Sequence, residues 1–267
     1  MMESYRAHAE AALKAYSAGE GLAPILAESM RYGLLDGGKR IRPCLLLCTA
    51  EMLGADPETT LPFACALEMI HCYSLIHDDL PAMDNDDSRR GKPSTHKQFG
   101  EANGILAGDG LLTAAALLLS KQPGHDAAKT AILSAALDMV SGQSYDLNAS
   151  DRSEAFLREL HRQKTGALFR AATEAAANLA DRNDLMPAFA ALGETIGMLF
   201  QITDDLLDAE RDRAEDKLTF VTFYGEDGAR AFAAEAERSA LATLADFDGA
   251  AADELRQLIR ALTCRTE

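Results

Sequence analysis

The stretch LPFACALEMIHCYSLIHDDLPAMD, residues 61–84, runs from an almost unbroken apolar segment into a group of carboxylates. Its apolar side chains would cover most of the circumference of a helix, and no β-branched alternation interrupts them. We therefore predict a helix from Leu61 to Asp79 that belongs to a central pair inside a large helical bundle. Asp78, Asp79 and Asp84 lie at the end of this helix.

Carboxylates are crowded at this point, because a single residue, Asn85, separates Asp84 from Asp86 and Asp87. Two unit charges about 4 Å apart at an effective dielectric near 20 repel by roughly 4 kcal/mol. Such a cluster lowers stability unless water screens it or a cation lies in it. A solvated acidic loop is the simpler explanation, and the rest of the chain must decide between the two.

The remaining sequence also favours helices, because alanine is abundant and glycine and proline are sparse inside the long segments. Turn sequences such as GADPET, KQPGHD, DRSE and YGEDG separate these segments. The expected helices span Met2 to Ser17, Leu22 to Tyr32, Arg42 to Leu53, Leu61 to Asp79, Gly104 to Ser120, Asp126 to Tyr145, Ser153 to Leu179, Asp184 to Asp208 and Gly228 to Thr263. The sequence shows no internal repeat, no low-complexity linker and no shift in composition. We therefore predict an all-α protein with a single domain over residues 1–267.

Composition limits the possible partners. The 267 residues include 26 Lys and Arg against 42 Asp and Glu, a formal net charge of −16, which repels nucleic acid and anionic lipid. The five cysteines form no C-x-x-C pair, as in a reducing cytoplasm. The N-terminus lacks the apolar core of a signal peptide, and the longest apolar run, Leu111 to Leu119, is short of the ~20 residues that a membrane span needs. We expect a cytoplasmic protein with no membrane span and no nucleic-acid partner.

A second acidic segment, FQITDDLLDAERD, covers residues 200–212. On a helix Asp204 and Asp208 share one face, and Asp205 is rotated by about 100° from Asp204 and adjoins it. The segment continues an apolar run without a turn, so its carboxylates would lie on an interior helix away from water. Such carboxylates indicate a bound metal ion. Mg²⁺ fits best, because it binds through one or two carboxylates and takes further oxygens from water and phosphates. No stretch has the spacing of a calcium loop.

A basic segment, LLDGGKRIRP, covers residues 34–43 and places Lys39, Arg40 and Arg42 after a glycine pair. Glycines let the backbone approach an anion, and arginine binds phosphate through two parallel hydrogen bonds. Taken alone, the segment could equally be a basic loop between helices. Together with Arg89 and Arg90 it indicates a second anion site that needs no metal ion.

These segments belong to a series of motifs in a fixed order: GGKRIRP, LEMIHCYSLIHDDLPAMDNDDSRRGKPSTHKQFGE, LAGDGLL, SGQSYDL, KTGALF and FQITDDLLD. In this order and combination the chain resembles the trans-isoprenyl diphosphate synthases, and most of all bacterial farnesyl diphosphate synthases. The resemblance covers nearly all of residues 34–224. It implies an isoprenoid-synthase helical bundle around a central apolar cavity, a homodimer, and Mg²⁺-dependent head-to-tail condensation of isopentenyl diphosphate with dimethylallyl or geranyl diphosphate.

The resemblance also implies a role for each matching residue. It assigns Asp78, Asp79 and Asp84 to one pair of Mg²⁺ ions and Asp204 with Asp208, beside Asp205, to a third, with Mn²⁺ as a possible substitute. Arg89, Lys164 and Lys217 would contact the allylic diphosphate, and Lys39, Arg42, His71 and Arg90, with Arg40 beside them, would hold isopentenyl diphosphate. Thr165 and Gln201 would turn oxygen dipoles toward the developing allylic cation.

Product length is expected to depend on Tyr73 and Ser74, which match the position of the family's chain-length determinant. A helix puts them about one turn below the metal-binding carboxylates, where a bulky ring would stop the growing chain. The extra Leu80-Pro81 in the acidic motif is shared with bacterial synthases that stop at fifteen carbons. We therefore expect farnesyl diphosphate, with geranylgeranyl diphosphate as the alternative.

One region departs from the family. The connection AERDRAED between Asp208 and Lys217 is shorter than usual and lacks the Gly-Lys pair, so the position of Lys217 and the closure of this segment over the phosphates are expected to differ from the family. His77, Met69, Met139 and Met198 are expected to be packing residues, and Asp86 and Asp87 to pair with arginines.

Three other functions remain open from the sequence. A terpene cyclase with the same fold would need no isopentenyl site, so the basic segment counts against it. A non-catalytic subunit of a heteromeric prenyl synthase would be expected to have lost one acidic motif. An acidic cation-binding protein would leave the basic segment unexplained.

Overall fold

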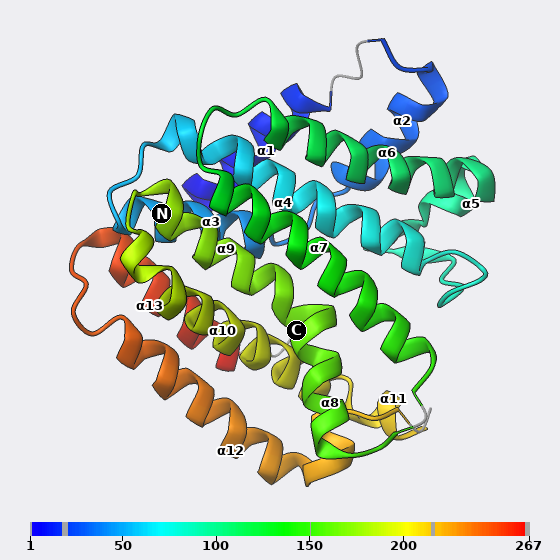
Figure 1. Cartoon of the computed structure of the whole chain (residues 1–267). Coiled ribbons are helices and arrows are strands. Elements are labelled where there is room, and N and C mark those ends of the chain that lie inside the picture. Colours follow the sequence, from blue (N-terminus) through cyan, green and yellow to red (C-terminus); the bar gives the residue numbers. More distant parts are fainter. Residues whose placement is uncertain (1, 18–20, 150, 215–216, 265–267) are drawn as a thin grey trace.

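Helices make up nearly all of the computed structural model, which describes residues 2–17, 21–149, 151–214 and 217–264 (Figure 1). The α-helices are α1 (Met2–Tyr16), α2 (Pro24–Leu34), α3 (Ile41–Met52), α4 (Pro57–Asp78), α5 (Thr95–Phe99), α6 (Glu101–Ser120), α7 (Asp126–Leu147), α8 (Glu154–His161), α9 (Ala167–Leu179), α10 (Met186–Leu207), α11 (Ala209–Ala214), α12 (Phe220–Thr243) and α13 (Ala250–Thr263). A π-helical segment, η1 (Arg162–Gly166), joins α8 to α9, and a 3₁₀ turn, η2 (Asn183–Leu185), precedes α10. The two short strands β1 (Ser88–Arg89) and β2 (Lys92–Pro93) pair antiparallel. The all-α prediction is confirmed.

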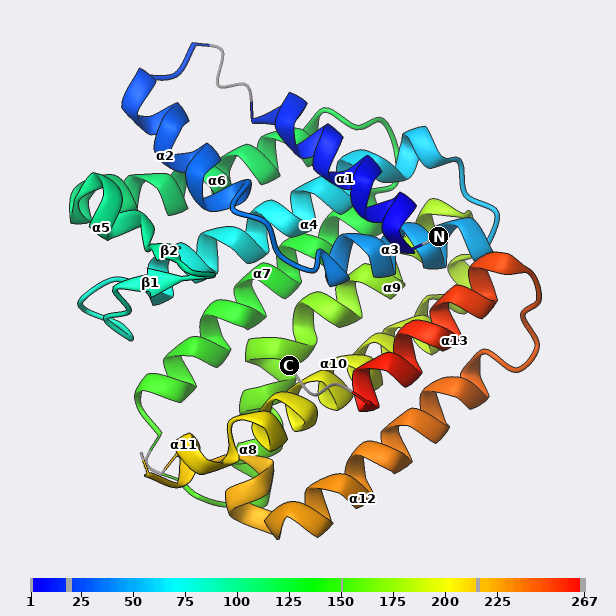
Figure 2. The same ribbon diagram turned by 180° about the vertical axis from the view of Figure 1, so that it is seen from behind.

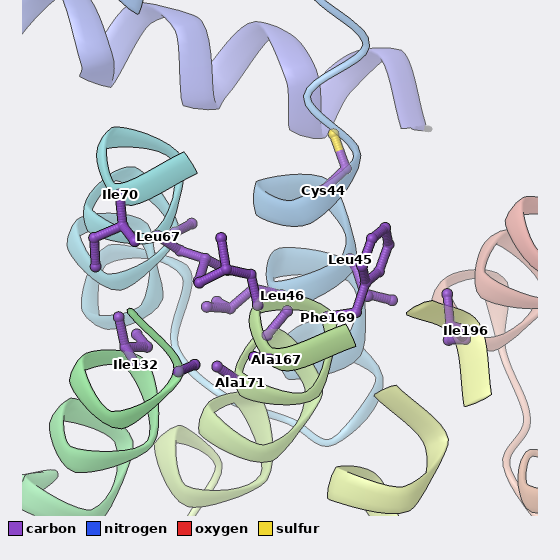
Figure 3. Close-up of a cluster of buried hydrophobic side chains, with 14 of the residues drawn as sticks. Cys44, Leu45, Leu46, Leu67, Ile70, Ile132, Ala167, Phe169, Ala171 and Ile196 are labelled. Atoms are coloured by element: carbon purple, nitrogen blue, oxygen red, sulfur yellow. The ribbon is translucent and has the colours of Figure 1, made fainter. Parts of the chain in front are cut away.

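The centre of the bundle is formed by α3, α4 and α9, which are buried around much of their circumference. α9 packs against α3, α7 and α10, and α4 packs against α3 and α6. Figure 3 shows Leu46, Leu67 and Phe169 meeting where α3, α4 and α9 come together. All three side chains are fully buried, and burial of one such side chain contributes about 1.5–3 kcal/mol. The core continues from Tyr5 to Leu262; the single domain over residues 1–267 stays a prediction.

α4 begins four residues before the predicted start at Leu61. Asp56 is its N-cap, and its carboxylate accepts hydrogen bonds from the backbone N–H of Thr59 at 2.9 Å and from the Thr59 hydroxyl at 2.8 Å. Pro57 occupies the first helical position, where a missing N–H costs nothing. The turn sequence GADPET therefore contains the helix start as well as the turn.

Two predicted helices are each divided in the structure. The segment Gly228 to Thr263 is not one helix, because α12 ends at Thr243 and Gly249, with a φ of 98°, precedes α13. The segment Ser153 to Leu179 changes to π-helix over Arg162–Gly166. Helical periodicity continues across both interruptions, so a pattern of apolar residues could not locate them.

A hairpin follows α4 that the sequence did not predict (Figure 2). Its turn residues Arg90 and Gly91 have φ values of 52° and 77°, the positive values that a two-residue hairpin turn favours. Strands of two residues have no apolar alternation to recognise. The hairpin matters because it carries Arg89 and Arg90.

Three segments are long and apolar enough to cross a membrane, judged by length and composition alone: Pro57–Asp78, Glu101–Ser120 and Asn183–Leu207. Within the bundle the first is 72% buried, and the others are 33% and 39% buried. The expectation of no membrane span rested on the longest uninterrupted apolar run, a stricter criterion than mean hydropathy. That expectation, the cytoplasmic location and the lack of a nucleic-acid partner stay predictions.

Candidate active site

Three adjoining cavities lie along α4, α7, η1 and α10. The central cavity has a volume of about 430 Å³ and is lined by Arg42, His71, Tyr73, Ser74, Leu75, His77, Asp78, Met83, Met139, Val140, Gln143, Ser144, Leu147, Asn148, Lys164, Thr165, Phe200, Gln201 and Asp204. The acidic cavity, of about 440 Å³, shares Lys164, Gln201 and Asp204 with it and adds Asp84, Asp205, Asp208 and Lys217. The basic cavity, of about 540 Å³, shares Arg42, His71 and Phe200 and adds Lys39, Arg40 and Arg90. Asp78 and Asp204, one from each acidic motif, both line the central cavity.

Asp78 and Asp79, the adjacent carboxylates of the first acidic motif, have different surroundings. Asp78, the last residue of α4, faces the central cavity. Burial raises its pKa to about 6; the charge of Lys164 lowers the pKa and that of Asp84 raises it. Asp79 is only 2% exposed, and its oxygens accept from Arg89 Nε at 2.8 and 2.9 Å. Asp79 therefore holds Arg89 in place, and metal binding by Asp79 stays a prediction.

The other acidic residues of this motif lie at the surface. Asp84 lines the acidic cavity, and its backbone N–H donates to the carbonyl of Asp78 at 2.9 Å, which keeps the two residues together. Asp86 lies 4.0 Å from Arg89, and Asp87 pairs with Lys97 at 2.7 Å. The contact of Asp86 with Arg89 agrees with the expected pairing with arginine, whereas the partner of Asp87 is a lysine.

The second acidic motif lies at the C-terminal end of α10. Asp204 lines both the central and the acidic cavity. Asp205 is 3% exposed, accepts from Gln201 Nε2 at 2.8 Å, and accepts from the backbone N–H of Phe220 at 2.7 Å. Asp208 is half-exposed and pairs with Arg211 at 3.0 Å. Asp205 thus connects α10 to the start of α12, and its assignment to a metal ion stays a prediction.

A chain of hydrogen bonds continues from Asp205 to the central cavity. Gln201 donates through Nε2 to Asp205, and its Oε1 accepts from Thr165 Oγ1 at 2.6 Å. Because the Thr165 proton is used in this bond, the lone pairs of its oxygen are left to face the cavity. This geometry suits the oxygen dipole expected at Thr165.

Lys164 and Thr165 lie in the π-helical segment η1, a conformation that occurs frequently at functional sites. Glycines let the neighbouring helices approach it closely. A Cβ atom on Gly142 of α7 would lie 2.3 Å from the backbone nitrogen of Lys164, and one on Gly197 of α10 would lie 2.8 Å from Cα of Gly166. Lys164 Nζ pairs with Asp146 of α7 at 2.5 Å. The segment is therefore held from both sides with Lys164 directed at the two acidic motifs.

Arg42 and His71 form the boundary between the central and basic cavities. Arg42 Nη1 lies 3.3 Å from His71 Nε2, and its guanidinium stacks over the ring of Phe169 at 4.6 Å. Burial, and then the charges of Arg42 and Arg90, hold the pKa of His71 well below its ordinary value. His71 is therefore neutral at pH 7 and can donate an N–H to an anion that Arg42 attracts.

The glycine pair of the basic segment accommodates Arg90. Arg90 Nη1 donates to the carbonyl of Gly37 at 2.6 Å, and a Cβ on Gly38, whose φ is 112°, would lie 2.8 Å from the Arg90 guanidinium carbon. Lys39 is exposed on the cavity wall. The residues Lys39, Arg42, His71 and Arg90 are thus brought together, as predicted for an anion site.

Arg40 differs from its neighbours, because its side chain is buried in an ion pair with Glu68 at 2.7 Å and also donates to the carbonyl of Leu34 at 2.7 Å. It holds the basic segment against α4, and substrate binding by Arg40 stays a prediction. Glu68 was the available signal in the sequence, since a lone charge within a long apolar helix requires a partner.

Tyr73 and Ser74 both line the central cavity. Tyr73 is 5% exposed, its hydroxyl has no hydrogen-bond partner within the part of the chain that the structure describes, and its ring meets the ring of His77 edge to face at 5.8 Å. His77 Nε2 lies 3.0 Å from the carbonyl of Ile105, consistent with a packing role. Tyr73 therefore forms part of the cavity wall about one turn before Asp78.

Divalent metal ions fit this donor set if water and phosphate oxygens supply the remaining ligands. In the described ranges, no three His, Cys, Asp or Glu side chains lie together in a group that could hold a metal ion alone. Mg²⁺ does not need such a group, since it binds through one or two carboxylates and completes its shell with water and phosphate oxygens. Asp78 and Asp204 offer oxygens from opposite motifs, and the raised pKa of Asp78 shows a carboxylate that a nearby cation would stabilise.

Sequence reasoning gave no role to several residues of the site. Gln143 and Asp146 were noted only as letters of the SGQSYDL motif, and Arg152 and His161 of the acidic cavity were not considered. Spacing on a helix offered a signal for the first two, because Met139, Gln143 and Asp146 lie within two turns of α7. Lys217 lines the acidic cavity at the end of the shortened connection, which forms the short helix α11.

An apolar cavity flanked by an acidic and a basic one, all inside a helical bundle, is the arrangement of an isoprenoid synthase, and comparisons with known proteins agree. The family described as polyprenyl synthetase matches residues 23–222. Farnesyl diphosphate synthase of Geobacillus stearothermophilus is 41% identical, with 88% of each chain covered. The large subunit 1 of a heterodimeric geranylgeranyl pyrophosphate synthase of Arabidopsis thaliana is 38% identical, covering 83% of this chain and 67% of that one. The crystal structure of a geranyltranstransferase from Thermotoga maritima has a TM-score of 0.86 at 32% identity, with 98% and 96% covered.

The class of protein is therefore an all-α prenyltransferase with the isoprenoid-synthase fold. The chain belongs to the polyprenyl synthetase family.

Proposed function

We propose that this prenyltransferase condenses isopentenyl diphosphate head to tail with dimethylallyl or geranyl diphosphate in a Mg²⁺-dependent reaction, and that farnesyl diphosphate is its main product. The observation that carries the proposal is the pair of differently built anion sites on one apolar cavity. One diphosphate must leave during the reaction and the other must stay, so two sites of different chemistry are required.

The acidic cavity suits the diphosphate that leaves. Asp78, Asp84, Asp204 and Asp208 are the residues that would hold Mg²⁺, or Mn²⁺ in its place. When bound, the ions would offset the charge of the departing diphosphate. Lys164, fixed by Asp146, adds a cation from the protein itself, and Arg89 and Lys217 are proposed to contribute from the hairpin and from the end of the shortened connection.

The basic cavity suits the diphosphate that stays. Its charge comes from Arg42, Arg90 and Lys39, with a neutral hydrogen-bond donor in His71. A guanidinium binds phosphate oxygens directly and does not favour loss of the diphosphate in the way that metal ions do. Isopentenyl diphosphate bound here would direct its alkene into the central cavity.

The chemistry follows from this arrangement. The C1–O bond of the allylic substrate breaks, and its electron pair leaves with the diphosphate. The alkene of isopentenyl diphosphate supplies the pair for the new carbon–carbon bond, and a proton is then lost to the released diphosphate. The lone pairs of Thr165 Oγ1, fixed by Gln201, face the cavity where the positive charge develops. Apolar neighbours such as Met139 and Phe200 limit access of water to that charge.

The farnesyl product is proposed from Tyr73. Five residues separate it from Asp78, which corresponds to about 7.5 Å along a helix, so its ring lies on the path of a prenyl chain held at the acidic cavity. Relatives named for both farnesyl and geranylgeranyl products have similar identity to this chain, and geranylgeranyl diphosphate is the alternative product.

The experiment that tests the function uses purified protein, Mg²⁺, labelled isopentenyl diphosphate and each allylic primer, with products separated by chain length. Farnesyl diphosphate should dominate, and chelation of the metal should abolish turnover. Undiminished turnover after thorough chelation would disprove the role of the acidic cavity.

Tyr73 variants test the product length. Tyr73→Ala should give longer products, because the ring no longer closes the cavity. Tyr73→Phe is the matched control, since the hydroxyl has no partner and its removal should leave the product unchanged. An active Tyr73→Ala enzyme with the wild-type product would show that another residue ends the chain.

The other functions considered from the sequence are less well supported. A terpene cyclase has no use for the basic cavity, and a simple cation-binding protein has none for an apolar cavity between two anion sites. A non-catalytic subunit is set aside, because both acidic motifs and Lys164 are present and the chain is a prenyltransferase.

A homodimer is proposed from the apolar side chains that α6 and α7 expose. Leu106 and Leu117 on α6 are 52% and 54% exposed, and Leu137 and Val140 on α7 are 70% and 50% exposed. Large apolar side chains gathered on one face usually mark an interface. Light scattering should give twice the chain mass, and Leu137→Glu should give a monomer; a wild-type monomer at micromolar concentration would contradict the proposal.

A further inference from the structure

Gln143 lines the central cavity, and no group in the described residues satisfies its side-chain amide. Both Oε1 and Nε2 are buried, and neither has a hydrogen-bond partner. Most buried side-chain polar atoms in proteins are hydrogen-bonded, so a wholly unpaired amide requires a reason. Because Gln143 lines the central cavity, the missing partner is expected to be a ligand in that cavity.

The position of Gln143 along α7 matches the first carbons of the allylic chain. Asp146, which holds Lys164 at the acidic cavity, lies three residues further on, and Met139 lies one turn in the opposite direction, among the apolar lining. Gln143 is therefore about 5 Å along the helix from the level at which the diphosphate would be held. The carbon atoms next to the diphosphate would pass this point.

The position is also rigid. Gly142 packs so closely on η1 that a Cβ there would lie 2.3 Å from the backbone nitrogen of Lys164 and 2.8 Å from the carbonyl carbon of Gln163. The backbone at Gln143 is thus held at a defined level beside Lys164 and Thr165.

Other polar groups at this level are already engaged. Thr165 donates to Gln201, and Gln201 donates to Asp205. Gln143 carries an oxygen acceptor at the same level that is not used in a protein hydrogen bond. In an apolar cavity, where water is limited, such an acceptor would interact strongly with a developing positive charge.

We infer that Gln143 is a further catalytic residue, whose amide oxygen Oε1 faces the allylic carbons and stabilises the positive charge that develops as the diphosphate leaves. The inference rests on the proposed prenyl transfer. No bond to Gln143 forms or breaks; the electron pair of the C1–O bond still leaves with the diphosphate, and the new carbon–carbon bond still takes its pair from the alkene.

The test compares two ligands by calorimetry, each in the presence of Mg²⁺. One is a geranyl-like chain with a protonated amine at the position of the allylic cation, added with inorganic diphosphate. The other is an uncharged-chain analogue, the thiolodiphosphate of geraniol, which does not ionise readily. Gln143→Met removes both polar atoms at nearly constant volume, Gln143→Glu keeps an oxygen, and Gln98→Met makes the same change on the exposed surface of α5.

Gln143→Met should weaken binding of the amine by roughly tenfold or more and change binding of the thiolodiphosphate by less than about twofold, with a matching fall in kcat. Gln143→Glu should retain affinity for the amine. The melting temperature of Gln143→Met should be unchanged or higher, because an unsatisfied buried amide has been removed. Gln98→Met should behave as wild type.

Other outcomes would overturn the inference. Equal binding of the amine by wild type and Gln143→Met would exclude a cation-stabilising role. Similar losses in Gln143→Glu and Gln143→Met would assign the effect to Nε2. A lower melting temperature with equal losses for both ligands would show a purely structural role. If wild type transfers prenyl groups but Gln143→Met binds the amine as tightly as wild type, the role of Gln143 is refuted and the proposed function is not. If wild type transfers no prenyl groups, the proposed function is refuted.

Discussion

Replacing Asp205 by alanine should make the protein easier to unfold even when no metal ion is present. The Asp205 carboxylate is 3% exposed and accepts two hydrogen bonds, from Gln201 Nε2 at 2.8 Å and from the backbone N–H of Phe220 at 2.7 Å. Alanine would leave both donors without their acceptor. The start of α12 and the side chain of Gln201 would each lose a fixed position.

The magnitude follows from these two bonds. A buried donor without a partner costs about 1–3 kcal/mol, so the loss of both should lower the free energy of unfolding by about 2–6 kcal/mol. For a chain of this size each kcal/mol lowers the melting temperature by about 2–4 °C, so the expected fall is roughly 4–24 °C. Activity should also fall, because Thr165 donates to the Gln201 oxygen and depends on its position.

The assay is thermal unfolding in a chelating buffer, with and without added Mg²⁺. Asp208→Ala is the matched control from the same motif. Asp208 is half-exposed and pairs with the neighbouring surface residue Arg211, an interaction that contributes about 0–1 kcal/mol. Asp208→Ala should therefore melt within about 3 °C of wild type without metal. If Asp205→Ala kept the wild-type melting temperature in the chelating buffer and lost only its response to Mg²⁺, Asp205 would be a metal ligand and the structural role would be refuted.

Three further predictions concern the walls of the site. Arg42→Ala should chiefly raise the KM for isopentenyl diphosphate and Lys164→Ala should chiefly lower kcat, because they lie at the basic and acidic cavities; steady-state kinetics with each substrate varied would contradict this if the effects were exchanged. Burial lowers the pKa of His161 from 6.5 to about 4. Between these two pH values the unfolded chain binds a proton at His161 and the folded protein does not, so the free energy of unfolding decreases as pH falls from 6.5 toward 4. His161→Phe, which keeps the stacking on Phe220, should remove about 2 kcal/mol of the loss between pH 7 and pH 5 in denaturant titrations, and an equal loss in both proteins would contradict it. Gly142→Ala should lower kcat by about 10²-fold, because its methyl group would displace Lys164; a wild-type kcat would show that η1 tolerates the shift.

Most helices could be predicted from the sequence because their apolar faces repeat at helical spacing. α3 (Ile41–Met52) differs from its predicted range by one residue at each end. The failures have a common cause, which is that backbone conformation changed without a change of apolar pattern. The positive φ of Gly249 and the π-helical turns of Arg162–Gly166 are of this kind, and so is the hairpin turn at Arg90.

The site could be predicted as a set of residues but not as a set of contacts. Residue types and their order identified the two acidic motifs, the basic segment and Lys164, and the structure brings them to adjoining cavities. Which partner each charge takes depends on tertiary packing. Arg40 is the clearest case: it lies between Lys39 and Arg42 in a basic segment, yet its side chain is buried in an ion pair with Glu68.

Helix geometry explains why the two adjacent aspartates in each acidic motif have different roles. Neighbouring residues on a helix point about 100° apart, so two successive carboxylates meet different surroundings. In each motif the first, Asp78 or Asp204, lines the central cavity. The second, Asp79 or Asp205, does not line the central cavity, is at most 3% exposed, and holds a neighbour of the site, Arg89 in one case and Gln201 in the other. A doublet of aspartates at the end of an interior helix therefore supplies one oxygen-bearing group to the central cavity and one that fixes the residues around it, and loss of the second should disturb the site without removing a carboxylate from the central cavity.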